Sequence, residues 1–302
     1  MRRTGALGDV VMATPVLRRL RRENPDATIA VQTAYPDVFR NSPHAPFLLH
    51  APALLSPGGS LPAWSGANAP DQVVDLDFAY ERHPDLHTAR AFMLAAFGDL
   101  GEPADLQPEL AFRPLDHWPA GRRVVAVHAA KAGWRSRTLP EATWVAVVAG
   151  LREAGFFPLL VGSGRDALPA AKAASFHSTD ILAQAAVIAR CAAWVGSDSA
   201  LLHVAGATDI PIVCAFTSVS AAVRLPWRHG ELGWRCEVVV PGNLECYGCH
   251  ADRTPPATDE VCRRGDFACV EAVKASDLVD TVVRIACCNR TVDRRARAET
   301  PV

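Results

Sequence analysis

Along most of the chain, segments with the apolar pattern of a buried strand alternate with segments that have the apolar spacing of a helix. Short, almost wholly apolar runs at residues 122–130 and 156–163 are typical of strands buried on both faces of a parallel sheet. Stretches with the apolar spacing of a helix lie at residues 141–155, 181–192 and 199–208. Regular alternation of strand and helix predicts right-handed crossovers and a doubly wound α/β sheet.

A shorter α/β series precedes this one. The pattern predicts helices at residues 10–22 and 86–101, strands at 27–33 and 71–78, and mainly loop at 43–70. Two prolines and a glycine interrupt the pattern at residues 112–121, which favours a domain boundary there. We therefore predict two Rossmann-like domains, residues 1–117 and 118–302, that face each other across a cleft.

Composition narrows the class of protein. The chain has 302 residues, of which 49 % are hydrophobic and 21 % are charged, and this balance is typical of a globular protein. Its net charge of −1 argues against a nucleic-acid partner, which would require many phosphates to be neutralised. No apolar run has the ~18 residues that a membrane span needs, and the N-terminus lacks the apolar core of a secretory signal. A cytoplasmic enzyme is the corresponding expectation.

The first candidate site is a glycine-bracketed turn close to the N-terminus. Gly5 and Gly8 flank this turn, Asp9 follows it, and an amphipathic helix with a basic last turn comes next. An acidic residue in the first turn of a helix suits the positive end of the helix dipole, so Asp9 could act only as a cap. The alternative is that the turn presents the Asp9 carboxylate to a ligand.

Three loops of the second domain are predicted to follow strands, where ligands of doubly wound sheets bind. The first loop carries Lys131, Arg135 and Arg137, and the second is a glycine-rich segment. The third leads into a helix. The candidate ligand-binding residues of the second and third loops are Gly162, Asp166, Asp198 and Ser199. Clustered cations beside small-residue loops favour a phosphate-bearing ligand, with Asp166 for a sugar hydroxyl. The P-loop and dinucleotide fingerprints are absent from the sequence.

Three segments resemble glycosyltransferase family 9, the ADP-heptose heptosyltransferases, in their order and spacing. They are "GALGDVVMATPVLRRLRRENPDATI", "KAGWRSRTLPEATW" and "GSDSALLHVAGATDIPIVCAFT", and the resemblance extends from about residue 4 to residue 285. It implies a GT-B fold with an N-terminal acceptor domain and a C-terminal nucleotide-sugar domain. It also implies inverting transfer of a heptose, without a catalytic metal, from ADP-heptose to an acceptor on the lipopolysaccharide core.

The resemblance assigns roles to particular residues. Asp9 corresponds to the proposed general base, and Arg137 corresponds to the basic residue that contacts the donor phosphate, with Lys131 as a second candidate. The family's Asp-Thr/Ser-Gly-Leu helix start corresponds to Asp198, Ser199, Ala200 and Leu201. His203 follows on this apolar helix, and we interpret it as a core residue.

Two departures from the family pattern stand out. Family members have a hydrophobic strand immediately before the first motif, and here only Met1–Thr4 stand in that place. We expect either that the true start lies upstream of Met1 or that the first sheet lacks a central strand, and losing that strand would leave unpaired backbone groups on both of its neighbours. The second departure is Ala200, which stands where the family usually has glycine and is tolerated if the backbone there is helical.

A cysteine-rich loop at residues 246–269 indicates a metal site. Cys246, Cys249, Cys262 and Cys269 are spaced as C-x2-C-x12-C-x6-C, which suits a tetrahedral thiolate site for structural zinc or iron. Reduced surface thiols are the alternative. A similar loop occurs in the autotransporter heptosyltransferase branch, whose members modify proteins and bind iron. The resemblance therefore adds a protein hydroxyl as a second acceptor class, and it leaves a homo-oligomer open.

Two rival functions remain open at this stage. One is a GT-B nucleotide-sugar epimerase, and the other is a catalytically impaired protein that binds a nucleotide sugar or serves in assembly. Release of nucleoside diphosphate only in the presence of an acceptor separates a transferase from both. A lipopolysaccharide acceptor would bring the enzyme into peripheral contact with the inner membrane.

Overall fold

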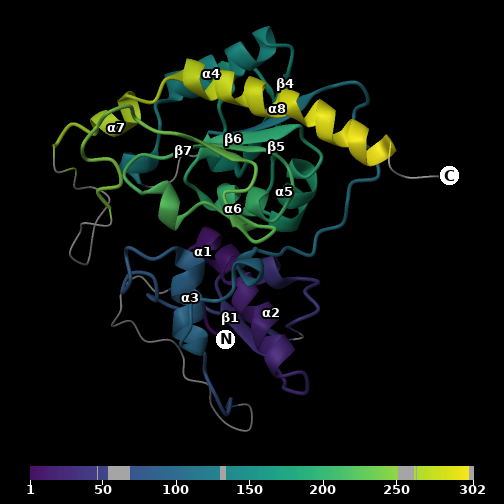
Figure 1. The fold of residues 1–302 in the computed structure, drawn as a ribbon, viewed down its shortest axis with the longest axis vertical. Coiled ribbons are helices and arrows are strands. Elements are labelled where there is room, and N and C mark those ends of the chain that lie inside the picture. Colours follow the sequence, from purple (N-terminus) through teal and green to yellow (C-terminus); the bar gives the residue numbers. More distant parts are fainter. Residues whose placement is uncertain (46, 54–68, 130–133, 251–261, 263, 299–302) are drawn as a thin grey trace.

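The computed structural model describes residues 1–45, 47–53, 69–129, 134–250, 262 and 264–298, with side chains as far as residue 286. Two α/β parts lie one above the other along the long axis of the molecule (Figure 1). Helices α1 to α3 belong to the N-terminal part, and helices α4 to α8 belong to the C-terminal part. The expected architecture of two Rossmann-like domains is confirmed.

The C-terminal domain contains a six-stranded, wholly parallel sheet. Its strands are β3 (Val124–His128), β4 (Phe157–Gly162), β5 (Ala174–His177), β6 (Ala193–Ser197), β7 (Ile212–Ala215) and β10 (Cys236–Val239). The spatial order β10-β7-β6-β3-β4-β5 is the dinucleotide-binding order: the chain adds strands on one side of β3 up to β5 and then, from β6 on, adds them on the other side, so the strand order reverses between β3 and β6. That reversal is where such sheets bind ligands.

Helices cover both faces of this sheet (Figure 1). One face carries α4 (Glu141–Glu153) and α8 (Ala275–Ala298), and the other carries α5 (Ile181–Ile188) and α6 (Ala200–Gly206). Side chains alternate along β3, so Val125 and Val127 pack in the core under α4 and α8, whereas Ala126 packs in the opposite core. The latter core continues into the N-terminal domain, so the two domains share one apolar cluster.

The N-terminal domain holds α1 (Leu7–Met12), α2 (Thr14–Glu23), β1 (Ala30–Thr33), β2 (Phe47–His50) and α3 (Thr88–Phe97). Strands β1 and β2 are parallel. Residues 1–4 run beside β1, and Arg2 forms parallel bridges to Gln32 on one side and to Asp75 on the other. The Arg2 N–H donates to the Val74 carbonyl at 2.8 Å, and the Arg2 carbonyl accepts from Leu76 N–H at 2.9 Å. The sequence predicts that the first strand is missing, whereas in the structure residues 1–4 take its place and pair with both neighbouring segments.

Several predicted boundaries differ from those observed. The helix predicted at residues 10–22 is two helices that divide at Ala13, since Pro15 stands at the start of the second and cannot continue the first. The helix predicted at 86–101 ends earlier, at Gly98 with φ 76°. The strand predicted at 71–78 is limited to the Asp75 bridge.

The remaining elements are short. They are α7 (Ala268–Glu271), the hairpin β8 (Trp227–Arg228) and β9 (Glu231–Leu232), and 3₁₀ turns at Pro36–Phe39, Pro103–Leu106, Arg135–Arg137, Gly164–Asp166, Pro169–Ala171 and Ala221–Val223. Within the described ranges, no helix is both long and apolar enough to cross a membrane.

Candidate active site at the domain junction

The two most specific sequence motifs meet at the junction of the domains, where α1 contacts α6. A Cβ atom on Gly8 would lie 2.8 Å from Cδ2 of His203 and 3.2 Å from Cα of Ala200. Glycine at position 8 therefore permits this close approach. Ala200 is the first residue of α6, so the backbone there is helical and accepts alanine in place of glycine.

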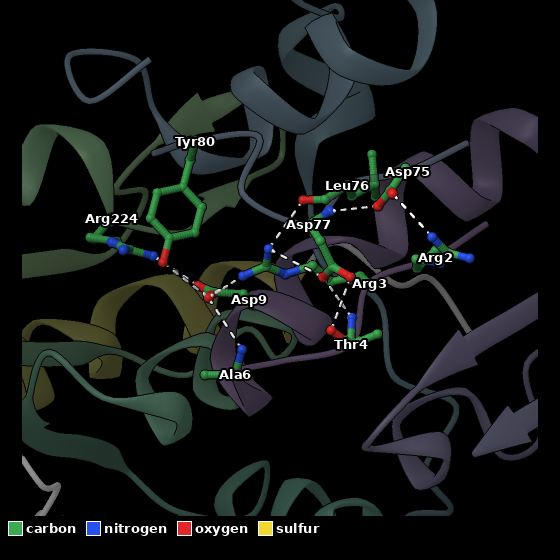
Figure 2. A network of polar contacts seen from close by, with 10 residues as sticks. All are labelled: Arg2, Arg3, Thr4, Ala6, Asp9, Asp75, Leu76, Asp77, Tyr80 and Arg224. Carbon is green, nitrogen blue, oxygen red and sulfur yellow. Dashed lines mark hydrogen bonds and ion pairs between the residues drawn. The ribbon is translucent and has the colours of Figure 1, made fainter. Parts of the chain in front are cut away.

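The carboxylate of Asp9 lies at this junction between two arginines (Figure 2). Nη2 of Arg3 donates to Oδ2 at 2.6 Å, and Nη1 of Arg224 donates to Oδ1 at 2.9 Å. The hydroxyl of Tyr80 and the Ala6 N–H approach Oδ2 at 3.3 Å and 3.4 Å. Asp9 is thus a weak helix cap and, at the same time, the centre of a network that joins both domains.

The electrostatics of this network keep Asp9 ionised. Asp9 is only 6 % exposed. Burial alone would raise its pKa, but the charges of Arg3 and Arg224 outweigh burial and lower the pKa to about 2. Burial raises the pKa of Tyr80, so its phenol stays protonated and can donate. At neutral pH the site therefore holds a carboxylate, a phenol and two guanidinium groups.

The residues around Arg3 fix its position. Nη1 of Arg3 donates to the Leu76 carbonyl at 3.1 Å and lies 3.7 Å from Oδ1 of Asp77. Asp77 also accepts from the N–H and hydroxyl of Thr4, at 2.8 Å and 2.9 Å. The next residue, Phe78, has φ 58°, a left-handed conformation that strains a bulky side chain. A strained residue between two members of the network is typical of a functional site.

His203 lies beside the Asp9 network. It is 3 % exposed, and burial lowers its pKa to about 4, so it is neutral at physiological pH. Its Nδ1 has no hydrogen-bond partner among the described residues. His203 therefore supports α1 by packing against Gly8 and adds no charge to the site.

A second ion pair lies across the C-terminal domain's loops. Nη1 of Arg137 donates to Oδ2 of Asp198 at 2.9 Å, and the Arg137 guanidinium lies 3.8 Å from the ring centroid of Trp134. Burial raises the pKa of Asp198, but Arg137 outweighs burial and lowers it. Arg137 and Asp198, both predicted to bind the nucleotide-sugar donor, are thus in direct contact.

The other residues predicted to bind the nucleotide-sugar donor do not gather around this ion pair. Arg135 is exposed and stacks on Phe267, with 4.4 Å from its guanidinium to the ring centroid. Leu201 is buried in the core shared with the N-terminal domain. Lys131 lies outside the described residues. Of the three predicted cations, only Arg137 is seen beside Asp198.

The glycine-rich loop after β4 turns its acidic residue inward. Gly162 has φ 133°, and a Cβ there would lie 2.7 Å from Oδ2 of Asp166. This same oxygen accepts from the N–H and hydroxyl of Ser163, each at 2.8 Å, and lies 3.6 Å from Nε2 of His128. Nδ1 of His128 in turn lies 3.0 Å from Oγ of Ser199. Asp166 and Ser199 are therefore connected through a histidine at the end of β3.

The four cysteines predicted to bind a metal gather around one cavity of about 10 Å³, roughly the room that one water-sized occupant needs. Burial raises the pKa of the Cys262 thiol, but hydrogen bonds from nearby backbone groups outweigh burial and lower it. The donor set therefore suits a metal ion in kind. Among the residues with described positions, however, no three His, Cys, Asp or Glu side chains lie close enough to hold one.

The cysteine cavity is close to the donor loop, although the two are far apart in sequence. Ser136, the neighbour of Arg137, lines this cavity together with Ser218, and their hydroxyls are 2.9 Å apart. His250 N–H also donates to the Ser218 carbonyl at 2.8 Å, and the His250 ring lies 5.2 Å from that of Trp134. The cysteine loop therefore packs against the segment that carries Arg137.

Sequence reasoning missed Arg3, Arg224, Tyr80 and His128. Arg224 is the only charged residue between Asp209 and Arg228, and an isolated charge in an otherwise uncharged segment after a strand was a usable signal. His128 ends a buried strand, which was a second signal. Arg3 and Tyr80 gave none, because their roles depend on contacts between distant segments.

A buried carboxylate of one Rossmann-like domain and an arginine–aspartate pair near the strand-order reversal of the other thus occur together in a mixed α/β fold of the GT-B type. The chain belongs to glycosyltransferase family 9 (heptosyltransferase), whose model matches residues 69–236. No curated protein matches the chain.

Solved structures share the fold at low sequence identity. The glycosyl transferase family 9 from Veillonella parvula DSM 2008 is 12 % identical, with a TM-score of 0.70 over 95 % of this chain and 96 % of that chain. The iron-containing dodecameric glycosyltransferase TibC from enterotoxigenic E. coli H10407 is 17 % identical, with a TM-score of 0.71 over 96 % of this chain and 75 % of TibC. E. coli heptosyltransferase WaaC with ADP is 14 % identical, with a TM-score of 0.58 over 94 % of this chain and all of WaaC.

Proposed function

We propose that this chain is an inverting heptosyltransferase that moves a heptose from ADP-heptose to a hydroxyl group of the lipopolysaccharide core or of a protein. Family membership supports the reaction type. The neighbour WaaC is described with ADP, and TibC is described in complex with ADP-D-beta-D-heptose, which supports the donor. The observation that carries the proposal is the buried, ionised Asp9 at the junction with the donor domain.

The C-terminal domain, residues 118–302, would bind the donor. Departure of a nucleoside diphosphate from the anomeric carbon develops negative charge on the phosphates, and cations aimed at that charge lower the barrier. Arg137 is the cation next to the strand-order reversal, and its Nε has no partner among the described residues. Asp198 holds its Nη1 in place at 2.9 Å. Ser199, at the start of α6, adds a hydroxyl near the same reversal.

Asp9 would accept the proton of the acceptor hydroxyl. A carboxylate with a pKa of about 2 is always ionised at neutral pH, and it is a weak base. Such a base suffices if the acceptor oxygen loses its proton late, after the anomeric bond has largely formed and the oxygen has become acidic. Oδ2 of Asp9 already faces Arg3, the Tyr80 hydroxyl and the Ala6 N–H, whereas Oδ1 accepts from Arg224 and keeps the larger acceptor capacity for the acceptor hydroxyl.

The N-terminal domain, residues 1–117, would bind the acceptor, since Asp9 belongs to it. The direct test of the proposal is a coupled assay for released ADP with ADP-heptose as donor. Transfer predicts ADP release that depends on the acceptor. An epimerase would alter the sugar without releasing ADP, and a binding protein would do neither.

We further propose that Cys246, Cys249, Cys262 and Cys269 hold a structural zinc or iron ion in the folded protein. Their common cavity and the iron-containing description of TibC support this proposal. Bound metal would tie the cysteine loop to Ser136 and so brace the Arg137 segment. About one metal ion per chain by elemental analysis is the expected result. TibC is also described as dodecameric, and light scattering of this protein tests whether it assembles in several copies.

A further inference from the structure

The short turn that leads to Arg224 is held by a side chain of the cysteine-rich loop, a contact that has no role in the transfer chemistry described above. The 3₁₀ turn Ala221–Val223 follows β7, and Arg224 comes directly after it. The Ala221 N–H donates to the hydroxyl oxygen of Tyr247 at 3.0 Å. Tyr247 stands inside the C-x2-C motif, so this motif is bonded to the turn that supplies an arginine to the active site.

Three consecutive hydrogen bonds connect Tyr247 with the carboxylate of Asp9. Ala221 makes the first through its N–H, and its carbonyl accepts the second from the Arg224 N–H at 3.1 Å. The third runs from Nη1 of Arg224 to Oδ1 of Asp9 at 2.9 Å (Figure 2). Ala221 and Arg224 are only 9 % and 6 % exposed, so water competes little for these bonds. The position of Arg224 relative to the C-terminal domain therefore depends on Tyr247.

Backbone bonds fix the Tyr247 side chain in this place. The Gly248 N–H donates to the Thr217 carbonyl at 3.1 Å, and the His250 N–H donates to the Ser218 carbonyl at 2.8 Å. Gly248 has φ 74°, a left-handed conformation that glycine adopts without strain. The Tyr247 ring also packs against the apolar core that the two domains share. This part of the cysteine loop is therefore a firm anchor for the turn.

The N-terminal domain also holds the turn, through the start of α3. Oγ1 of Thr88 donates to the Val223 carbonyl at 3.3 Å, and Nε2 of His87 lies 2.8 Å from the Leu225 carbonyl oxygen. These two bonds belong to the N-terminal domain, whereas Tyr247 belongs to the C-terminal domain. Loss of the Tyr247 hydroxyl would keep both bonds and loosen the turn on the C-terminal side alone.

We propose that Tyr247 is a positioning residue of the transfer reaction, which holds Arg224 in place beside Asp9 through the hydrogen bond to Ala221. This role rests on the proposed function, because it takes Asp9 as the base. Arg224 orients Oδ1 of Asp9, the oxygen that keeps the larger capacity for the acceptor hydroxyl. A displaced turn would misplace this oxygen and slow the transfer step. It would not weaken donor binding, because the donor is bound by other loops.

Replacement of Tyr247 by phenylalanine removes the hydroxyl oxygen and keeps the ring. The kcat of acceptor-dependent ADP release should fall about fivefold, as expected when one neutral hydrogen bond is lost. The KM for ADP-heptose and the ADP affinity in calorimetry should stay at their wild-type values. Tyr35→Phe is the matched control and should keep full kcat, since Tyr35 is 36 % exposed on the N-terminal domain.

A second background separates positioning from a general loss of stability. In Arg224→Met protein, Tyr247→Phe should lower kcat no further, because the hydroxyl acts through Arg224. The effects of the two substitutions on urea unfolding, a readout that needs no substrate, should likewise be non-additive. Tyr247→Leu, which also lacks the hydroxyl, repeats both measurements should Tyr247→Phe not fold.

The outcomes distinguish this role from the proposed function. Wild-type kcat in Tyr247→Phe protein would overturn the positioning role and leave the proposed function intact. The same fold loss of kcat with and without Arg224, or additive effects on unfolding, would overturn it equally. Absence of acceptor-dependent ADP release in the wild-type protein would overturn the proposed function itself, and the positioning role with it.

Discussion

Replacement of Arg224 by methionine should destabilise the protein through the domain junction. Arg224 donates to Asp9 at 2.9 Å, its guanidinium lies 4.5 Å from the Tyr80 ring centroid, and the residue is 6 % exposed. Methionine keeps most of the apolar stem and removes the charge. The variant therefore isolates the electrostatic part of the contact.

The expected size follows from the partners that remain. Breaking a buried ion pair by removing one partner costs about 3–5 kcal/mol, because the other charge stays buried without compensation. Asp9 keeps Arg3 at 2.6 Å, so we expect the lower end, about 3 kcal/mol. The pKa of Asp9 is about 2 in the folded protein against an ordinary value of 3.8, so its ionisation stabilises the fold by on the order of 2 kcal/mol.

The sign of the pH dependence follows from this depressed pKa. The Asp9 contribution is fully present above about pH 4 and is lost as the pH falls through about 2. Without Arg224 the folded-state pKa of Asp9 rises, so the contribution shrinks. The difference in stability between wild type and Arg224→Met should therefore be largest near pH 7 and should narrow below about pH 4.

Urea unfolding at several pH values measures this difference. Arg40→Met is the matched control, because Arg40 also pairs across the domains, with Asp180 at 2.7 Å, but is 44 % exposed at its side chain. That exposed pair should contribute less than about 1 kcal/mol. A double-mutant cycle with Asp9→Asn isolates the Asp9–Arg224 coupling. Equal losses in Arg224→Met and Arg40→Met would refute the reasoning.

Three other variants, the first with a matched control, test the donor side, the metal site and the domain junction. Arg137→Ala should weaken ADP binding by on the order of 2 kcal/mol in calorimetry. The control Arg135→Ala should bind ADP normally, because the guanidinium of Arg135 stacks on Phe267. Cys262→Ser should lose the bound metal and lower the melting midpoint, and unchanged metal content would contradict the site. The affinity for ADP should fall as well, because the cysteine cavity includes Ser136, the neighbour of Arg137. Gly8→Ala should slow turnover, since its Cβ would lie 2.8 Å from His203, and an unaltered rate would show that the contact relaxes freely.

The central part of the fold was predictable because its signal is local. β3 is buried along its whole length, and all of its residues except the last, His128, are apolar. The edge strands β5 and β10 are short and partly exposed, so their sequences carry no continuous apolar run, and the pattern does not predict them. The strand predicted at residues 71–78 pairs only through Asp75, because the short segment at residues 1–4 limits the ladder beside it.

The candidate site was predictable only in part, for the same reason. Asp9 and Asp198 belong to motifs of a few consecutive residues, and a sequence displays such motifs directly. The partners that set their charge do not, because Arg224 lies 215 residues from Asp9 in the chain and Arg137 lies 61 residues from Asp198. The nearness of the cysteine cavity to Ser136 also arises only in the folded chain.

The central claim is that Asp9 is the base of the transfer reaction, and the turnover of Asp9→Asn tests it most directly. Asparagine keeps the shape of the side chain and cannot accept the proton, so the rate of acceptor-dependent ADP release should fall by roughly 10²-fold or more. ADP affinity should stay close to that of wild type, and Asp75→Asn, at an exposed carboxylate of the same domain, should retain full turnover. Wild-type turnover by folded Asp9→Asn protein would contradict the account and leave Asp9 a structural link between the domains.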